Sequence, residues 1–159
     1  MSSQRFNAPG WRSITIAGLV TLVMGLSTSS AFAAVGAEPN SGLPKTSPTS
    51  IAVTGTAFKA GEKYRVGLCS KKTYGVMGIP ACGTMLEVTA DGSGAFSTSV
   101  TVEKTTTNVH AKIPFPLNLG QPEKFTCAGS AANDECQIAV AEHGGTKAIL
   151  GGKVVTFLE

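Results

Sequence analysis

Four cysteines have the clearest chemistry in this 159-residue chain: Cys69, Cys82, Cys127 and Cys136. An even number of cysteines in an exported chain usually forms disulfides, and the sequence leaves three pairings open. The sequential pairing closes loops that span 13 and 9 positions, which a hairpin or a corner can accommodate. Zinc is not expected, because neither sequential pair has C-x2-4-C spacing and the two histidines, His110 and His143, lie far apart in sequence.

Other residue types form no recognisable catalytic arrangement. The sequence contains no G-x-S-x-G segment, no Ser/His/Asp set and no phosphate-binding glycine loop. The adjacent carboxylates Asp134 and Glu135 lie in a polar segment between two cysteines, which is typical of a solvated surface. We therefore expect a protein that is not an enzyme and binds no metal.

Residues 1–33 have the layout of a secretory signal peptide. Arg5 and Arg12 precede an uncharged apolar run, Ile14–Leu26, and small residues follow up to the cleavage pattern Ala31-Phe32-Ala33. The run has 13 residues, fewer than the ~20 that a membrane-spanning helix needs. We expect cleavage after this pattern and secretion without membrane association, with an uncleaved anchor as the alternative.

Composition favours an all-β domain. Hydrophobic residues make up 42% of the chain and charged residues only 14%, which excludes a disordered polyelectrolyte. The 19 glycines and 8 prolines break helices, while the many threonines suit strands. Removal of Arg5 and Arg12 with the signal peptide lowers the net charge from +3 to about +1, so little attraction to nucleic-acid phosphates is expected.

The exported part is expected to be a leading segment followed by one sandwich domain. Residues 34–50 are rich in Pro, Ser, Gly and Thr and predict an exposed segment with a short edge strand near Val35–Glu38. Within residues 51–159, seven or more short strands are expected at intervals near ten residues. This spacing is typical of two antiparallel sheets in an immunoglobulin-like β-sandwich.

The expected strands are defined by alternating apolar residues. The first two begin at Ile51 and Tyr64. Thr84–Ala90 and Phe96–Val102 flank the turn Asp91-Gly92-Ser93-Gly94 and predict a hairpin. The later strands are expected over residues 109–113, 124–127, 137–142 and 153–158. No helical period is visible after the signal peptide.

Three segments that occur in order resemble the neocarzinostatin family: Gly61–Cys69 (GEKYRVGLC), Val88–Ser99 (VTADGSGAFSTS) and Cys136–Ile138 (CQI). The resemblance covers most of the exported chain. It implies a secreted protein with a seven-stranded immunoglobulin-like fold and two local disulfides, which here would join Cys69 to Cys82 and Cys127 to Cys136. In characterised members, a cleft at one end of the sandwich holds a reactive enediyne chromophore non-covalently, shields it from water and delivers it to DNA.

The resemblance also indicates where a ligand would lie. The residues expected to contact it are Tyr74, Met77, Ile79, Met85, Gln137 and Glu142, with Val76 in the same disulfide loop. Lys71 stands in the place of a family tryptophan and Met85 in that of a phenylalanine, so flat stacking faces are replaced by flexible side chains. Alternatively, the apolar residues pack beneath the disulfide loop and Gln137 bonds only to neighbouring backbone.

The function expected from the sequence is that of a secreted antibiotic or antimicrobial carrier protein. It would be a monomer that holds a small apolar, enediyne-like ligand and contacts DNA only through that ligand or weakly. The alternative is a secreted structural or adhesion module that keeps the sandwich and has lost the ligand site. Lys71 in the place of an aromatic residue favours this alternative, and a hollow at the end of the sandwich would favour the carrier.

Overall fold

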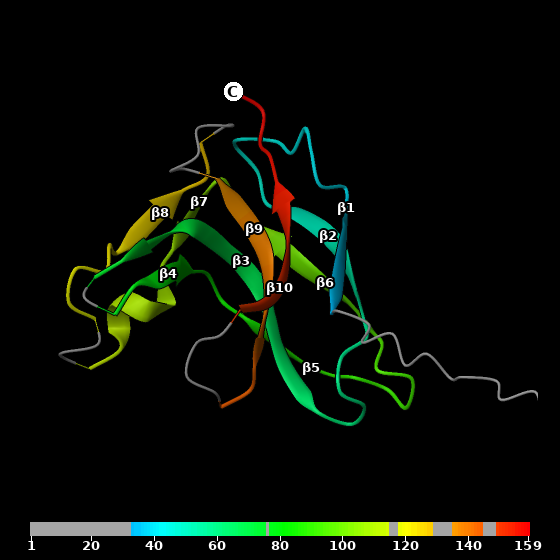
Figure 1. Ribbon diagram of the computed structural model, residues 1–159. Coiled ribbons are helices and arrows are strands. Elements are labelled where there is room, and N and C mark those ends of the chain that lie inside the picture. The colour runs from blue at the N-terminus through cyan, green and yellow to red at the C-terminus, as the bar shows by residue number, and fades with distance from the viewer. Residues whose placement is uncertain (1–32, 76, 115–117, 129–134, 145–148) are drawn as a thin grey trace, which may run out of the picture. The chain divides into compact units, whose positions relative to one another are not determined.

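A computed structural model of the chain describes residues 33–75, 77–114, 118–128, 135–144 and 149–159 (Figure 1). Residues 1–32, which make up nearly all of the expected signal peptide, lie outside the described residues, so the cleavage site stays a prediction. Among the described residues, none forms a helix long and apolar enough to cross a membrane.

One sheet has three antiparallel strands in the order β1-β2-β6. Their bounds are β1 (Ala34–Glu38), β2 (Thr49–Thr56) and β6 (Phe96–Val102). Along β2, Ile51 and Val53 are buried while their neighbours are exposed, as the alternation of apolar residues predicts. The strand β1 lies at the edge of this sheet, at the place of the short strand expected near Val35–Glu38.

The other large sheet has five strands, one face of which packs against the core while the other faces outward. It contains β3 (Lys63–Tyr74), β4 (Ile79–Cys82), β5 (Leu86–Thr89), β9 (Cys136–Glu142) and β10 (Ile149–Val155). The strand β9 pairs with one edge of β3 and with β10, while β4 and β5 pair with successive parts of the other edge of β3. A separate ribbon joins β7 (Thr105–Thr107) to β8 (Lys124–Thr126).

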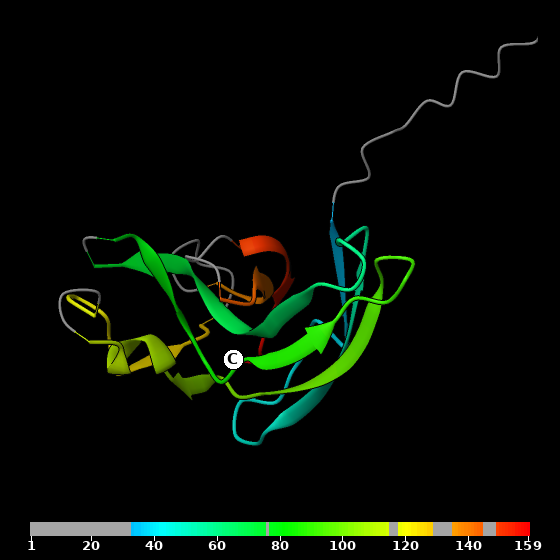
Figure 2. The same ribbon diagram turned by 90° about the horizontal axis from the view of Figure 1, so that it is seen from below.

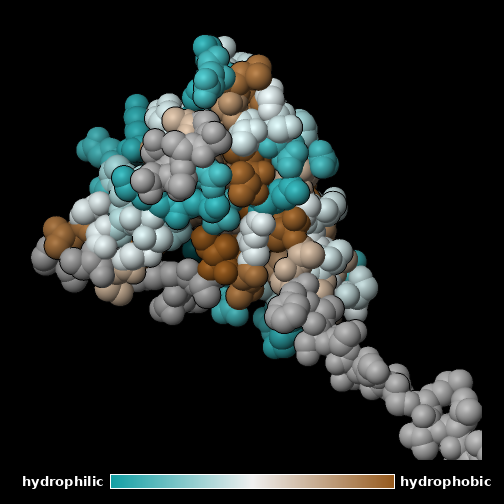
Figure 3. Space-filling model, turned by 45° about the horizontal axis from the view of Figure 1, so that its top comes forward, coloured by the Kyte–Doolittle hydropathy of each residue, from teal (hydrophilic) through white to brown (hydrophobic). Residues whose placement is uncertain are grey.

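The core lies between these two sheets. Figure 2 shows β3 and β6 in separate layers, with the ribbon that contains β8 (yellow) at one side. Alternate residues of the facing strands fill the layer, including Val66, Val100 and Ile138, and the all-β sandwich expected from the sequence is confirmed. Apolar surface outside the core is also present, since Figure 3 shows a central band of apolar side chains bordered by hydrophilic ones.

Aromatic side chains are used in the core. The Phe58 ring lies 4.9 Å from that of Tyr64 and 5.2 Å from that of Phe96, measured between centroids. Phe125 and Phe157 are buried in the same core. These five rings therefore lie in the core, where offset and edge-on contacts between rings are favourable.

Residues 34–50 are a structural part of the sandwich, in addition to supplying an edge strand. Ala37 and Leu43 are buried in the core. Leu43 also bonds to the C-terminal segment, since its N–H donates to the Thr156 carbonyl at 3.1 Å and its carbonyl accepts from Leu158 at 2.8 Å. The segment is thus less exposed than its composition suggests.

The hairpin expected around residues 91–94 is wrong. The strand β5 pairs with β3 and the strand β6 with β2, so this turn carries the chain from one sheet to the other. Asp91 Oδ1 accepts hydrogen bonds from the N–H groups of Ser93, at 2.8 Å, and Ala95, at 3.0 Å. Local turn chemistry reverses the chain, but it does not decide which strands pair.

The strand expected over residues 109–113 is also wrong, because a 3-10 helix, η1, spans Val109–Lys112. Asn108 caps it, with its side-chain oxygen accepting from the His110 N–H at 3.0 Å. Capping by asparagine favours a helical turn over the extended strand that the alternation predicts.

Candidate functional site

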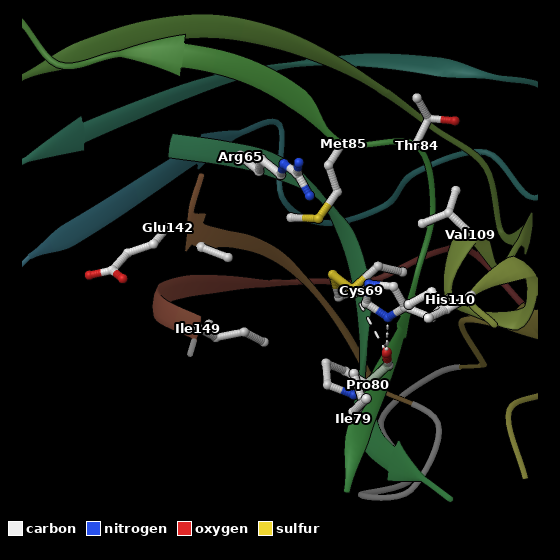
Figure 4. A pocket seen from close by; sticks show the side chains of 13 residues that line it. Arg65, Cys69, Ile79, Pro80, Thr84, Met85, Val109, His110, Glu142 and Ile149 are labelled. Atoms are coloured by element: carbon white, nitrogen blue, oxygen red, sulfur yellow. Dashed lines mark hydrogen bonds between the residues drawn. A yellow bond between two sulfur atoms is a disulfide. The ribbon is translucent and has the colours of Figure 1, made fainter. Parts of the chain in front are cut away.

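A cavity of about 560 Å³ lies over the outer face of the five-stranded sheet, opposite the core, whereas the resemblance implied a cleft at one end of the sandwich. One wall is formed by η1 and the residue after it, and the rest by β3, β4, β9, β10 and the segment before β5 (Figure 4). Most of the lining is apolar: Cys69, Ile79, Pro80, Cys82, Met85, Val109, Ile113, Ala141 and Ile149.

The disulfide between Cys69 and Cys82 forms the floor. The two cysteines lie directly opposite one another on β3 and β4, and both are buried. Ala139 is buried in the same cluster, against which Met85 and Ile149 pack from opposite sides of the floor. The floor is therefore formed by the disulfide and is apolar.

Gly67 lets the chain before β5 lie close over β3. A Cβ at this position would be 3.0 Å from Met85 Cγ and 3.0 Å from the Thr84 carbonyl oxygen. Such distances are shorter than ordinary van der Waals contact. The absence of a side chain at Gly67 thus places Met85 in the wall of the cavity.

Asn108 fixes the η1 wall to the floor. The side chain is fully buried, and its Oδ1 accepts from the Cys82 N–H at 3.1 Å. Its Nδ2 donates to the Pro122 carbonyl at 2.8 Å and to the Gln121 side chain at 3.0 Å. Since every polar atom of this side chain is bonded, its burial is compatible with a stable fold.

Four polar side chains line the cavity: Arg65, Thr84, His110 and Glu142. His110 Nδ1 lies 2.8 Å from the Pro80 carbonyl oxygen. In Figure 4 the Arg65 side chain extends beside Met85, and the Glu142 carboxylate points away from the other labelled residues. Within the described residues, no group of three His, Cys, Asp or Glu side chains is placed to hold a metal ion.

Comparisons with known proteins place this arrangement among solved folds. The chain matches no protein-family model and no curated protein. It is similar to the structure of macromomycin, with a TM-score of 0.59 and 21% identity over 79% of this chain and 99% of that chain. It is also similar to apokedarcidin in solution, with a TM-score of 0.52 and 21% identity over 80% and 99% of the two chains. The chain has the fold of macromomycin and apokedarcidin.

Within this fold, both disulfides join the cysteines that the resemblance implies. Cys69 pairs with Cys82 and Cys127 with Cys136. The first bridge lies under the cavity, whereas the second is buried in the sandwich core. The two bridges therefore serve different regions of the sandwich.

Three of the six residues expected at the ligand line the cavity, namely Ile79, Met85 and Glu142. Tyr74 instead packs against the edge of the core, with the Lys72 ammonium 5.4 Å from its ring, and Met77 is 52% exposed. Neither lines the cavity. Val76 lies outside the described residues.

Gln137 lies next to the cavity rather than in its lining. It alternates with Ile138 and Val140, which face the core, and so shares the outer face of β9 with Ala139. Its amide occupies the space above Gly152, where a Cβ would be 2.7 Å from Gln137 Oε1. This contact favours a glycine at position 152, which lies inside β10, although the glycines were expected to precede the strand.

Lys71, in the place of a family tryptophan, forms an ion pair. Its Nζ lies 2.6 Å from Glu135 Oε2, and its N–H donates to the Glu135 carbonyl at 2.8 Å. No aromatic ring of the described residues lines the cavity other than the His110 imidazole. Apart from this imidazole and the other polar side chains, the walls are therefore aliphatic or sulfur-containing. This agrees with the expectation that flexible side chains replace flat stacking faces.

Sequence reasoning missed His110, Pro80 and Ile113, among other lining residues. His110 and Ile113 fall in the segment misread as a strand, and they reach the cavity only because Asn108 turns that segment into η1. The one sequence signal that marks the turn is an asparagine at the N-cap position.

Proposed function

We propose that this chain is a secreted, non-enzymatic protein that binds a small apolar molecule in the cavity and shields it from water. The observation that carries the proposal is the cavity itself. Its volume of about 560 Å³ falls within the roughly 300–1,000 Å³ usual for small-molecule sites. Its predominantly apolar lining, with a few polar groups, is also typical of such sites.

The likeness to macromomycin and apokedarcidin supports a carrier over an enzyme. The family resemblance implies an enediyne-like chromophore as the cargo. The lining fits a small apolar group by shape and by burial, but it supplies no Phe, Tyr or Trp face for stacking among the described residues. We therefore propose a cargo with mainly aliphatic or alicyclic surface against the protein.

Action on DNA, and with it an antibiotic effect, would belong to the cargo. The exported chain carries a net charge of about +1, which supplies little attraction to phosphates. A protein of this charge is not expected to bind DNA tightly by itself.

Native mass spectrometry of the protein from its producer's medium tests the proposal directly. The expected result is a complex heavier than the polypeptide, which loses the extra mass on extraction with organic solvent. As a second test, 1-adamantanol is titrated into the protein and followed by backbone amide shifts. Ala141→Trp, which fills the cavity, should abolish the shifts, whereas Ala52→Trp on the exposed face of β2 should not.

A structural or adhesion module is the second candidate, and the Lys71–Glu135 ion pair in the place of an aromatic contact favours it. It predicts no bound mass and no adamantanol shift that Ala141→Trp removes. That pair of results would reject the carrier function.

A further inference from the structure

His110 lines the cavity and has one ring nitrogen, Nδ1, bonded to the protein. A carbonyl oxygen can only accept a hydrogen bond, so the 2.8 Å contact with the Pro80 carbonyl requires Nδ1 to carry the proton. In the neutral imidazole, Nε2 is then an acceptor. No hydrogen bond joins Nε2 to another described residue.

The position of this acceptor is set by two further contacts. Asn108 Oδ1 holds the His110 backbone N–H at 3.0 Å and the Cys82 N–H at 3.1 Å, so the helix η1 and the floor are tied to the same atom. In Figure 4 a dashed line joins the imidazole to the Pro80 carbonyl, and both cysteines of the bridge line the same cavity. A polar group held in this way needs no rearrangement to bind, which favours specificity.

The other polar groups cannot do the same work. Arg65 has only donors, and the Glu142 carboxylate points away from the bridge in Figure 4. Thr84 can accept a hydrogen bond, but its hydroxyl points away from the bridge in Figure 4. An apolar cavity with one fixed acceptor should favour ligands that carry a hydrogen-bond donor over ligands that carry none. A ligand without a donor would exclude water from Nε2 and leave this acceptor unpaired, which weakens binding.

We propose that His110 is a ligand-binding residue whose Nε2 accepts a hydrogen bond from the cargo, so that the cargo carries a hydroxyl group on an aliphatic or alicyclic body. This inference rests on the proposed carrier function and narrows its ligand class. It assigns no chemical step to His110.

The test compares 1-adamantanol with 1-methoxyadamantane, which has nearly the same body and no donor. The protein is expressed as the full chain and recovered from the medium, and both dissociation constants are measured from amide shifts. One neutral hydrogen bond should make the alcohol bind about three- to tenfold more tightly than the ether. His110→Asn keeps a donor for the Pro80 carbonyl and lacks Nε2, so the preference should fall to about onefold.

His143→Asn is the matched control, since it makes the same substitution at a histidine outside the cavity lining and should keep the preference. A measurement on the unsubstituted protein does not depend on any variant folding. In the ¹⁵N spectrum of the imidazoles, Nδ1 of His110 should be the protonated nitrogen, and only the alcohol should shift the Nε2 resonance. His143→Gln assigns the two histidines.

The outcomes separate the two proposals. If neither compound binds in a way that Ala141→Trp prevents, the carrier function falls and this inference falls with it. If both compounds bind in the cavity with equal affinity, or if Nε2 is the protonated nitrogen, the carrier function stands and the role of His110 is rejected.

Discussion

At the residue scale, the cavity depends on polar and glycine positions whose importance is visible only in three dimensions. Asn108 bonds to β4, to η1 and to the segment before β8 from a fully buried position. Gly67 matters through the side chain that it lacks. Both act by placing other residues, so neither needs to touch a ligand.

Asn108→Leu tests the first of these residues. The substitution keeps the volume roughly but leaves the Cys82 N–H and the Pro122 carbonyl without their partner. Each buried unpaired group costs about 1–3 kcal/mol, so a clear fall in the free energy of unfolding is expected in a urea titration. Asn118→Leu is the control, because the Asn118 side chain makes no hydrogen bond to another described residue. Equal losses in the two variants would contradict the role of Asn108.

Gly67→Ala tests the close approach of Met85 to β3. The new Cβ would lie 3.0 Å from Met85 Cγ and from the Thr84 carbonyl oxygen, and the latter cannot move as a flexible side chain does. Overpacking of this kind costs about 1–3 kcal/mol, and adamantanol binding should weaken because the wall shifts. Gly92→Ala meets no atom within 4 Å and should leave both measurements unchanged. A Gly67→Ala protein of full stability and affinity would show that the wall adapts.

At the element scale, the sequence predicts strands better than it predicts their partners. The alternation at Ile51 and Val53 locates β2, and the alternation from Tyr64 locates β3, because each has one face on the core. The strand β4 was not expected, since all four of its residues are buried and it shows no alternation. The strand β7 consists of three threonines and carries no apolar signal either.

The candidate site was only partly predictable for the same reason. Met85 could be named because it lies just before a recognisable segment of the resemblance, and Ile79 because it lies in the loop between Cys69 and Cys82. His110 could not, since it reaches the cavity through the Asn108 cap and through packing against β4, which are contacts between segments distant in sequence. Tertiary contacts of this kind override local patterns.

The turn between β5 and β6 gives a pH-dependent prediction. Hydrogen bonds from the Ser93 hydroxyl, and then from the Ala95 and Ser93 N–H groups, lower the pKa of Asp91 below its ordinary value of 3.8. A carboxyl group whose folded-state pKa is lowered stabilises the fold above its unfolded-state pKa. That contribution is lost as the pH falls through the folded-state pKa.

Asp91→Asn should therefore destabilise the protein at neutral pH, and the difference from the unsubstituted chain should shrink in acid. The measurement is the urea midpoint from about pH 7 to about pH 2, together with the Asp91 carboxyl titration by NMR. Glu123→Gln, at an exposed carboxyl outside this turn, serves as the control. A stability difference that stayed constant with pH would argue against the ionised carboxylate as the cause.

At the scale of the whole molecule, the expected cleavage site lies directly before the first strand of the sandwich. The first residue of β1 is Ala34, which pairs with Thr56. Cleavage after Ala33 would preserve the whole edge strand, which pairs with β2 along its length. The intact mass of the secreted protein should therefore correspond to a chain that begins at Ala34. A start at Met1 would support an uncleaved anchor, and a start beyond Glu38 would show that β1 is dispensable.

The two disulfides allow stability to be separated from binding. They span 13 and 9 residues, so the loop-closure model assigns both a similar stabilisation of about 2–3 kcal/mol. Only Cys69–Cys82 forms the floor of the cavity, while Cys127–Cys136 belongs to the core. Replacing either pair by alanine should therefore lower the urea midpoint to a similar extent, provided that the variants fold.

The affinity for 1-adamantanol, measured under conditions in which each variant is still folded, should then differ between the two disulfide variants. Loss of Cys69–Cys82 frees β4, and with it the Pro80 carbonyl and the Cys82 N–H that hold His110 and Asn108, so affinity should fall at least tenfold, or about 1.4 kcal/mol. Loss of Cys127–Cys136 leaves those contacts in place and should change affinity little. Equal effects on affinity would mean that the cavity depends on the stability of the sandwich as a whole rather than on the bridge beneath it.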